Sequence, residues 1–324
     1  MIKAMRWMAL IAVLGVPSLA FPQAPAAYPN KPIRIVIPAA PGGNPDVLAR
    51  LLGQKLQPML GVPMVMDNQP GAGGISAAIN VSKSAPDGYV LFFGDSGIVI
   101  GVAVNPSLPF NPLKDVTLIT ALAGLPTVLI APTSLPASNL AEFMALAKAR
   151  SGQLNYGSAG VGSIHHLTMA VFLMETGLDM VHVPYKGGSP MVAAVMAGEV
   201  QAGWSGIPNV QAAIKAGKLK VFGISTLHRS RSLPDVPTLD EQGVKGFDVA
   251  TMLGVQAPAG VPRDIVAKLQ SAIARGLREP DVAERMVTLG MEMSENGTEH
   301  YVQYVKNEVQ RYGAAVKAAG IKPE

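Results

Sequence analysis

Two glycine-rich segments carry the residues that are best placed for binding chemistry. The first, AAPGGNPD (39–46), follows the β-branched run Ile33–Ile37 and precedes leucines at helical spacing. A tight turn at a helix start leaves backbone N–H groups without helical partners, and these groups can bind a carboxylate or a phosphate. Gly42 and Gly43 permit such a turn. The alternative is an ordinary strand-to-helix corner whose N–H groups bind water.

The second segment, GSAGVGS (157–163), also lies between a predicted strand (153–156) and a predicted helix. If both helix starts face one cleft, two lobes can close on one small anion. Asp46 has two possible roles, as a helix cap or as a ligand contact. Pro45 and the apolar repeat after Asp46 favour the cap.

Three further motifs imitate catalytic or cofactor sites. GDSG (94–97) matches the nucleophile region of trypsin-like proteases, but in that family the histidine precedes the serine, whereas all five histidines here follow it. GAGG (71–74) imitates a dinucleotide-binding fingerprint, but Ser76 replaces the last glycine. His165 and His166 would point about 100° apart on a helix, and no carboxylate pair completes a metal site. We expect no catalytic residue, cofactor or metal; an exported enzyme with a dinucleotide-binding-like loop is the alternative.

The elements that position these loops alternate as strand and helix along the chain. This pattern predicts an α/β fold of mostly parallel sheets with flanking helices. The long apolar run Val116–Pro132 and a return strand at Phe247–Pro258 indicate two crossings between lobes. We predict lobe 1 at 27–124 plus 251–324 and lobe 2 at 125–250, joined by a two-segment hinge. The segment GDSGIVIG (94–101) is predicted to be a loop.

The N-terminus and the composition indicate export. Lys3 and Arg6 precede the apolar segment Trp7–Val16, which predicts a signal peptide over residues 1–20, with cleavage as late as residue 26 as an alternative. The chain has no cysteine, as suits an oxidising compartment. Lys3 and Arg6 account for half of the net charge of +4, which is too weak for a nucleic-acid surface. We expect a periplasmic monomer.

Taken together and in order, the motifs resemble one known family, the Bug receptors, which are the extracytoplasmic solute receptors of tripartite tricarboxylate transporters. The similarity runs from about Tyr28 to Lys322, and its main motifs are PIRIVIPAAPGGNPD, NQPGAGG, APDGYVLFFG, LNYGSAGVGSIHHL and HVPYKGGSP. The resemblance implies a two-lobed type II periplasmic-binding-protein fold that captures a small organic carboxylate. It also implies delivery to membrane transporter subunits, with no catalysis and no cofactor; a ligand sensor for a signalling partner is an alternative.

The resemblance also implies which loops contact the ligand. The residues carried over are Ala39, Ala40, Gly42, Gly43, Asn44, Asp46, Asp95, Ser96, Ser158, Ala159, Gly160, Ser163, Tyr185, Lys186, Trp204 and Ser205. Lys186 has an equal alternative as a solvated turn lysine. The chain departs from the family at Ser205, where many members carry an aspartate, and this disfavours an amino-acid ligand. The small Ala39 and the nearby Trp204 predict room for, and stacking against, an aromatic or larger ligand.

Overall fold

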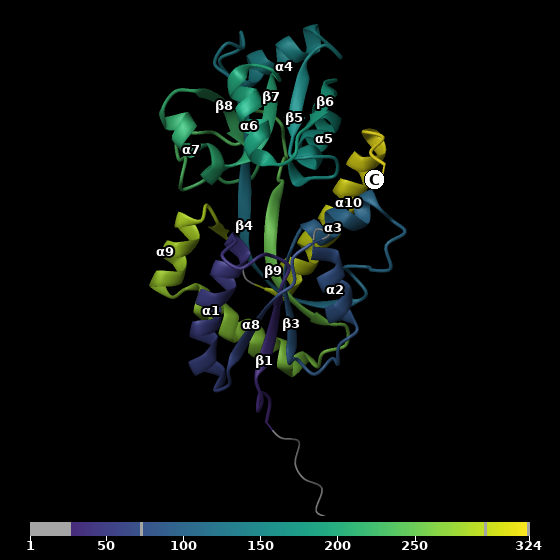
Figure 1. Ribbon diagram of the computed structural model, residues 1–324, viewed down its shortest axis with the longest axis vertical. Helices are drawn as coiled ribbons and strands as arrows, with labels where there is room; N and C mark the ends of the chain where they lie inside the picture. Colours follow the sequence, from purple (N-terminus) through teal and green to yellow (C-terminus); the bar gives the residue numbers. More distant parts are fainter. Residues whose placement is uncertain (1–26, 72–73, 295–296, 323–324) are drawn as a thin grey trace, which may run out of the picture.

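The computed structural model describes residues 27–71, 74–294 and 297–322, which form two α/β lobes (Figure 1). The predicted signal peptide lies outside the described residues, as does the centre of the GAGG segment. The predicted α/β fold with two lobes is confirmed. We call the lower lobe in Figure 1 lobe 1 and the upper one lobe 2.

Lobe 1 is organised around a parallel sheet. Its strands are β1 (Ile33–Ile37), β2 (Met64–Asn68) and β3 (Val90–Asp95), with β1 in the middle. Its helices are α1 (Asn44–Leu60), α2 (Ile75–Ser82), α3 (Gly97–Val104), α8 (Arg263–Leu277) and α9 (Pro280–Thr288). The apolar residues of α1 and α8 recur at helical spacing and bury one face of the sheet, including Leu52 and Ile273.

Lobe 2 repeats this arrangement. The strand β5 (Asn155–Ser158) pairs in parallel with β6 (Val181–Pro184) and β7 (Ala202–Gly206). The other elements are α4 (Leu140–Ala149), α5 (Ile164–Thr176), α6 (Gly188–Ala197), α7 (Ile207–Lys215) and β8 (Leu219–Ile224). The rings of Phe143 and Phe222 stack 5.0 Å apart in its core.

Two long strands, β4 (Val116–Pro132) and β9 (Ala250–Pro258), run between the lobes (Figure 1). Residues 116–126 of β4 pair antiparallel with β9, whereas residues 127–132 pair with β7 and β8. A short strand, β10 (Glu292–Met293), also pairs with β4. Ser225 ties the strands where β4 changes partner: its Oγ accepts from Thr127 N at 3.0 Å and donates to Val249 O at 2.5 Å.

The C-terminal helix α10 (Thr298–Ala318) also reaches both lobes. It begins beside β4 and packs against α3 of lobe 1 and α5 of lobe 2 (Figure 1). Its buried face carries three tyrosines and one acid, Glu308, which is only 4% exposed.

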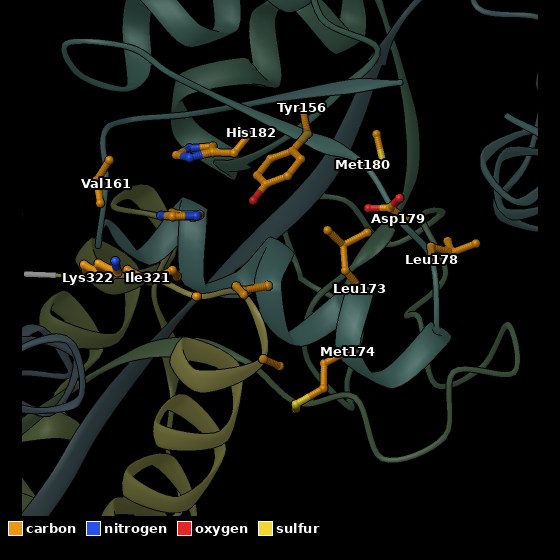
Figure 2. Close-up of a pocket in the computed structure, with 15 residues that line it drawn as sticks. Tyr156, Val161, Leu173, Met174, Leu178, Asp179, Met180, His182, Ile321 and Lys322 are labelled. Atoms are coloured by element: carbon orange, nitrogen blue, oxygen red, sulfur yellow. The ribbon is translucent and has the colours of Figure 1, made fainter. Parts of the chain in front are cut away.

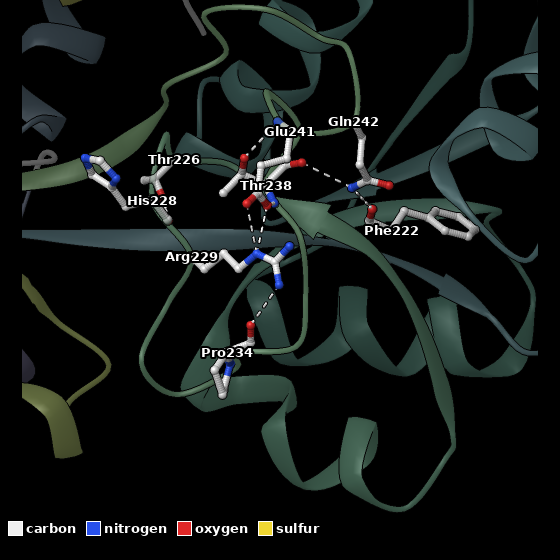
Figure 3. Close-up of polar contacts among 8 residues, drawn as sticks. All are labelled: Phe222, Thr226, His228, Arg229, Pro234, Thr238, Glu241 and Gln242. Atoms are coloured by element: carbon white, nitrogen blue, oxygen red, sulfur yellow. Dashed lines mark hydrogen bonds and ion pairs between the residues drawn. The ribbon is translucent and has the colours of Figure 1, made fainter.

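The connection from β8 to β9 is held by side chains in lobe 2 (Figure 3). Arg229 Nε donates to both carboxylate oxygens of Glu241, at 3.0 and 2.8 Å. Gln242 Nε2 donates to Phe222 O at 2.7 Å. These contacts fold the connection against its own lobe.

The predicted loop at 94–101 is wrong in its second half, because Gly97–Val104 form α3. The residues GIVIGVAV are apolar all around, so they show no helical period although the helix is buried against α2, α5 and α10. The helix α9 was also not predicted.

Candidate functional site

A cavity of about 350 Å³ lies between the two lobes, and we call it the interlobe cavity. Its walls come from three places: lobe 1, the strand β9, and the start of α5 in lobe 2. The lining residues are Pro38, Asp95, Gly97, Ile100, Gly101, Gly162, Ser163, Ile164 and Thr251. The site therefore combines the carboxyl ends of β1 and β3 with the second-lobe loop 158–163, and parallel sheets place ligands at such strand ends.

Two helices begin at the wall of the interlobe cavity. Gly97 is the first residue of α3, and Ser163 is the N-cap of α5. The first carbonyl-bonded amide of α5 is Leu167 N, which donates to Ser163 O at 2.9 Å, so the N–H groups of Ile164 and His165 have no partner within the helix. Free N–H groups and the positive end of the helix dipole favour an anion here.

Asp95 is the acidic residue of this wall. Its Oδ1 accepts from Gly97 N at 2.8 Å, which satisfies one of the free amides of α3. Burial raises the pKa of the Asp95 carboxyl, and the Gly97 hydrogen bond partly opposes this rise. An ionised Asp95 repels an anionic group and accepts from a hydroxyl or an ammonium group.

Asp46 shapes the first glycine-rich loop rather than presenting its charge to the cavity. The helix α1 begins at Asn44, so Asp46 is its third residue and not its N-cap. Its carboxylate accepts from Gly42 N at 2.9 Å, Arg50 Nε at 2.9 Å and Asn68 Nδ2 at 2.8 Å. The favoured prediction that Asp46 caps the helix is wrong, because Gly43 is the N-cap and the amide bonded to Asp46, Gly42 N, lies before the helix.

These three partners hold the pKa of Asp46 down to about 2, with the Arg50 hydrogen bond as the largest cause. The Asp46 side chain is only 2% exposed. Asn68 Nδ2 also donates to Ala39 O at 3.0 Å, so the network fixes the loop from both of its ends.

The second-lobe loop 158–163 is held by its own hydroxyl groups. Ser158 Oγ accepts from Gly160 N at 3.1 Å, and Ser163 Oγ donates to Gly160 O at 2.7 Å. Ser158 is completely buried. Its hydroxyl therefore shapes the loop, and the predicted ligand contact at Ser158 stays a prediction.

Three other predicted contact side chains are buried away from the interlobe cavity. Ser96 is 2% exposed, and its hydroxyl is already bonded to Glu308 and to Met252 N. Trp204 and Ser205 are completely buried. The prediction that Trp204 stacks on a ligand is wrong, because its ring is buried and stacks on the ring of Phe247, with the two centroids 5.7 Å apart.

The remaining predicted residues differ in their exposure. Ala40, Gly42, Asn44 and Lys186 are exposed, and Ala39, Gly43, Ala159, Gly160 and Tyr185 are half-buried. None of these nine is among the lining residues, which include only Asp95 and Ser163 from the predicted set.

Sequence reasoning missed several wall residues. Gly162 lies inside the predicted binding loop 158–163 and Ile164 lies next to it, so the sequence could have indicated both residues. Thr251 lies on the return strand, and no motif marks it. Within the described residues, no three His, Cys, Asp or Glu side chains are grouped to hold a metal ion. The described part of the chain also contains no helix that is both long and apolar enough to cross a membrane.

Comparison with known proteins agrees with the family resemblance of the sequence motifs. The family model described as tripartite tricarboxylate transporter family receptor matches residues 48–321. Protein BugT of Bordetella pertussis is 32% identical over 319 residues, which are 97% of this chain and 98% of BugT.

Two solved structures at similar identity contain carboxylates. MatC from Rhodopseudomonas palustris, with bound malate, is 34% identical with a TM-score of 0.69 and covers 89% of this chain and 100% of its own. A second R. palustris protein, with adipate, is 30% identical with a TM-score of 0.72 and covers 92% of this chain and 100% of its own.

Proposed function

The chain belongs to the receptor family of the tripartite tricarboxylate transporters, and from this we propose that it captures a small organic carboxylate between its lobes. Members of this family are solute-binding receptors and not enzymes. The chain would act in the periplasm and deliver its ligand to membrane subunits of the same transporter class. Neither step requires a cofactor.

One observation carries the proposal: α3 and α5 both begin at the wall of the same interlobe cavity. The lining residues in the described chain include no lysine or arginine. Backbone N–H groups and helix dipoles would therefore supply the positive potential for a carboxylate. A receptor that must release its ligand gains from such contacts, because they are weaker than a buried ion pair with arginine.

Asp95 would set the second requirement for a ligand. Its carboxylate lies beside the α3 start and would accept a hydrogen bond from a ligand hydroxyl. A carboxylate that also carries a hydroxyl, such as malate, would bind the backbone N–H groups through its carboxylate and Asp95 through its hydroxyl. The solved relatives with malate and adipate support small dicarboxylates as the first compounds to test.

The proposal is tested by a thermal-shift screen of the purified protein against mono-, di- and tricarboxylates, amino acids, sugars and NAD. We expect stabilisation by one or more carboxylates, with malate and adipate in the first set. Stabilisation by sugars only would contradict the proposal. A clear shift with NAD and none with carboxylates would instead support the dinucleotide-binding alternative.

A further inference from the structure

A second cavity of about 710 Å³ lies between lobe 2 and the C-terminal residues 318–322, beside the loop 158–163. Val161 of the loop lines this cavity, whereas the next residues, Gly162 and Ser163, line the interlobe cavity. The loop is therefore a thin wall between the two cavities. Figure 2 shows the rings of Tyr156 and His182 at one side of the second cavity, with the C-terminal residues near Lys322 closing another side.

Three rings stack behind the loop. The ring centroids of His166 and His182 are 3.7 Å apart with an interplanar angle of 14°. The ring of Tyr156 lies 5.0 Å from that of His182, at 26°. His166 comes from the first turn of α5 and His182 from β6, so the stack joins two elements that flank the loop.

Both histidines are hydrogen-bonded to the loop. Gly162 N donates to His166 Nδ1 at 3.2 Å, and Ser158 Oγ lies 2.7 Å from His182 Nε2. Gly162 has a φ of +71°, a conformation that favours glycine, so this bond holds a sharp turn at the wall of the interlobe cavity. The two histidines thus hold the first residue of the loop and its last turn.

The bond from Gly162 requires a neutral His166, because an amide N–H can only donate to a nitrogen that carries a lone pair. Burial and the neighbouring His182 lower the pKa of His166 to about 4. Burial also lowers the pKa of His182. Both rings are therefore neutral at neutral pH, and the stack carries no charge there.

We propose that His166 and His182 are positioning residues that hold the loop 158–163 in its ligand-binding shape, and that protonation of His166 weakens carboxylate binding by breaking its bond to Gly162. This inference rests on the proposed function. The other titratable groups that line the second cavity are Tyr156, Asp179 and Lys322. Attraction between a charged histidine and an anion would act in the opposite direction, so the two effects differ in sign.

The test compares two variants of His166 with a control. His166→Leu removes the acceptor, whereas His166→Asn keeps an oxygen near the position of Nδ1 but does not titrate. His228→Leu serves as the control, because His228 lies on the β8–β9 connection and lines neither the interlobe cavity nor the second cavity. Malate and adipate are the probes, measured by calorimetry, and exchange of the Gly162 amide is measured without ligand.

At pH 7 we expect His166→Leu to bind roughly 3- to 10-fold more weakly, as for the loss of one neutral hydrogen bond, and His166→Asn to bind like the wild type. The Gly162 amide should exchange faster in His166→Leu only. At pH 4, the ratio of wild-type to His166→Asn dissociation constants should rise about twofold, because half of His166 is then protonated. Protonation of the probe affects both dissociation constants equally, so it does not change this ratio.

Equal losses of affinity in His166→Leu and His166→Asn would overturn the proposal, as would a wild-type protein that binds relatively more tightly at pH 4. If His166→Leu does not fold, the pH ratio still decides the matter. If the wild type binds no carboxylate, the proposed function fails by itself. Exchange of the Gly162 amide then decides separately whether His166 positions the loop, and an unchanged rate in His166→Leu contradicts it.

Discussion

The hydroxyl of Ser96 lies 3.0 Å from both carboxylate oxygens of Glu308, a residue 212 positions later in the chain. The same hydroxyl accepts from Met252 N at 2.9 Å, and Tyr312 donates to Glu308 at 3.2 Å. One buried acid on α10 therefore joins the start of α3 to the strand β9. Burial raises the pKa of Glu308 to about 8, so this acid is protonated at neutral pH.

Glu308 should make the protein less stable as the pH rises. Between the ordinary value of 4.5 and about 8 the folded state binds more protons than the unfolded state, so the free energy of unfolding falls across this window. Glu308→Gln should flatten the dependence, as measured by urea unfolding from pH 5 to pH 9. The control is Glu284→Gln at an exposed position of α9. Equal slopes in wild type and Glu308→Gln would contradict the assignment.

Asp46 should stabilise the protein at neutral pH and lose this effect at acid pH. Its folded pKa of about 2 lies below the ordinary 3.8, so its contribution is present at neutral pH and is lost as the pH falls through this window. Asp46→Asn should cost about 1–3 kcal/mol at pH 7, because charged hydrogen bonds to Gly42 and Arg50 are lost. Denaturant unfolding at pH 7, pH 3 and pH 2 measures this. A cost that persists undiminished at pH 2 would show that the charge is not responsible.

Much of the fold could be predicted because it depends on local pattern. The β-branched run Ile33–Ile37 and the leucines of α1 occupy faces that the sequence period defines. The helix α3 is not predicted, because a helix that is apolar on all sides shows no hydrophobic period in the sequence.

The site was harder to predict because side-chain roles depend on distant partners. Ser96 and Ser158 have the type and spacing of contact residues, but their hydroxyls are used by Glu308 and by Gly160. Trp204 has a ring suited to stack on a ligand, but this ring is buried because Phe247, 43 residues later in the chain, packs against it. No local sequence pattern predicts these contacts.

A side-chain contact between the lobes should oppose their closure. Ala250 and Met252 line a cavity with Glu292, whereas Thr251 lines the interlobe cavity, so Glu292 lies behind the strand β9. Glu292 Oε1 accepts from Ser230 Oγ at 2.9 Å and from Arg231 N at 3.0 Å, and so joins lobe 1 to lobe 2. We propose that ligand binding closes the lobes about β4 and β9, and that closing the front opens this rear contact.

Glu292→Ala should therefore favour the closed form and bind malate roughly 3- to 10-fold more tightly, because on this proposal the lost hydrogen bonds from Ser230 and Arg231 oppose closure. Small-angle scattering should show compaction of the wild type with ligand and a more compact free state in Glu292→Ala. Glu299→Ala, at an exposed position of α10, is the control. Weaker binding by Glu292→Ala would place the contact in the closed form.

The central claim is that the free amides at the start of α5 bind a ligand carboxylate. Ile164 is the first residue of α5, and Ser163 before it has a φ of −68° and a ψ of 158°, which suits a following proline. Ile164→Pro therefore removes one N–H donor and keeps the helix, because proline is tolerated at this position. Ile164→Val keeps the N–H group, and Arg263→Pro makes the same backbone change at the exposed start of α8.

The most direct measurement is calorimetry of the best carboxylate from the screen against these three variants. We predict that Ile164→Pro loses roughly 10- to 100-fold in affinity, as for one hydrogen bond to a charged group, with little change in thermal stability. Ile164→Val and Arg263→Pro should bind like the wild type. Unchanged affinity in a folded Ile164→Pro variant would contradict the claim that the α5 start holds the carboxylate.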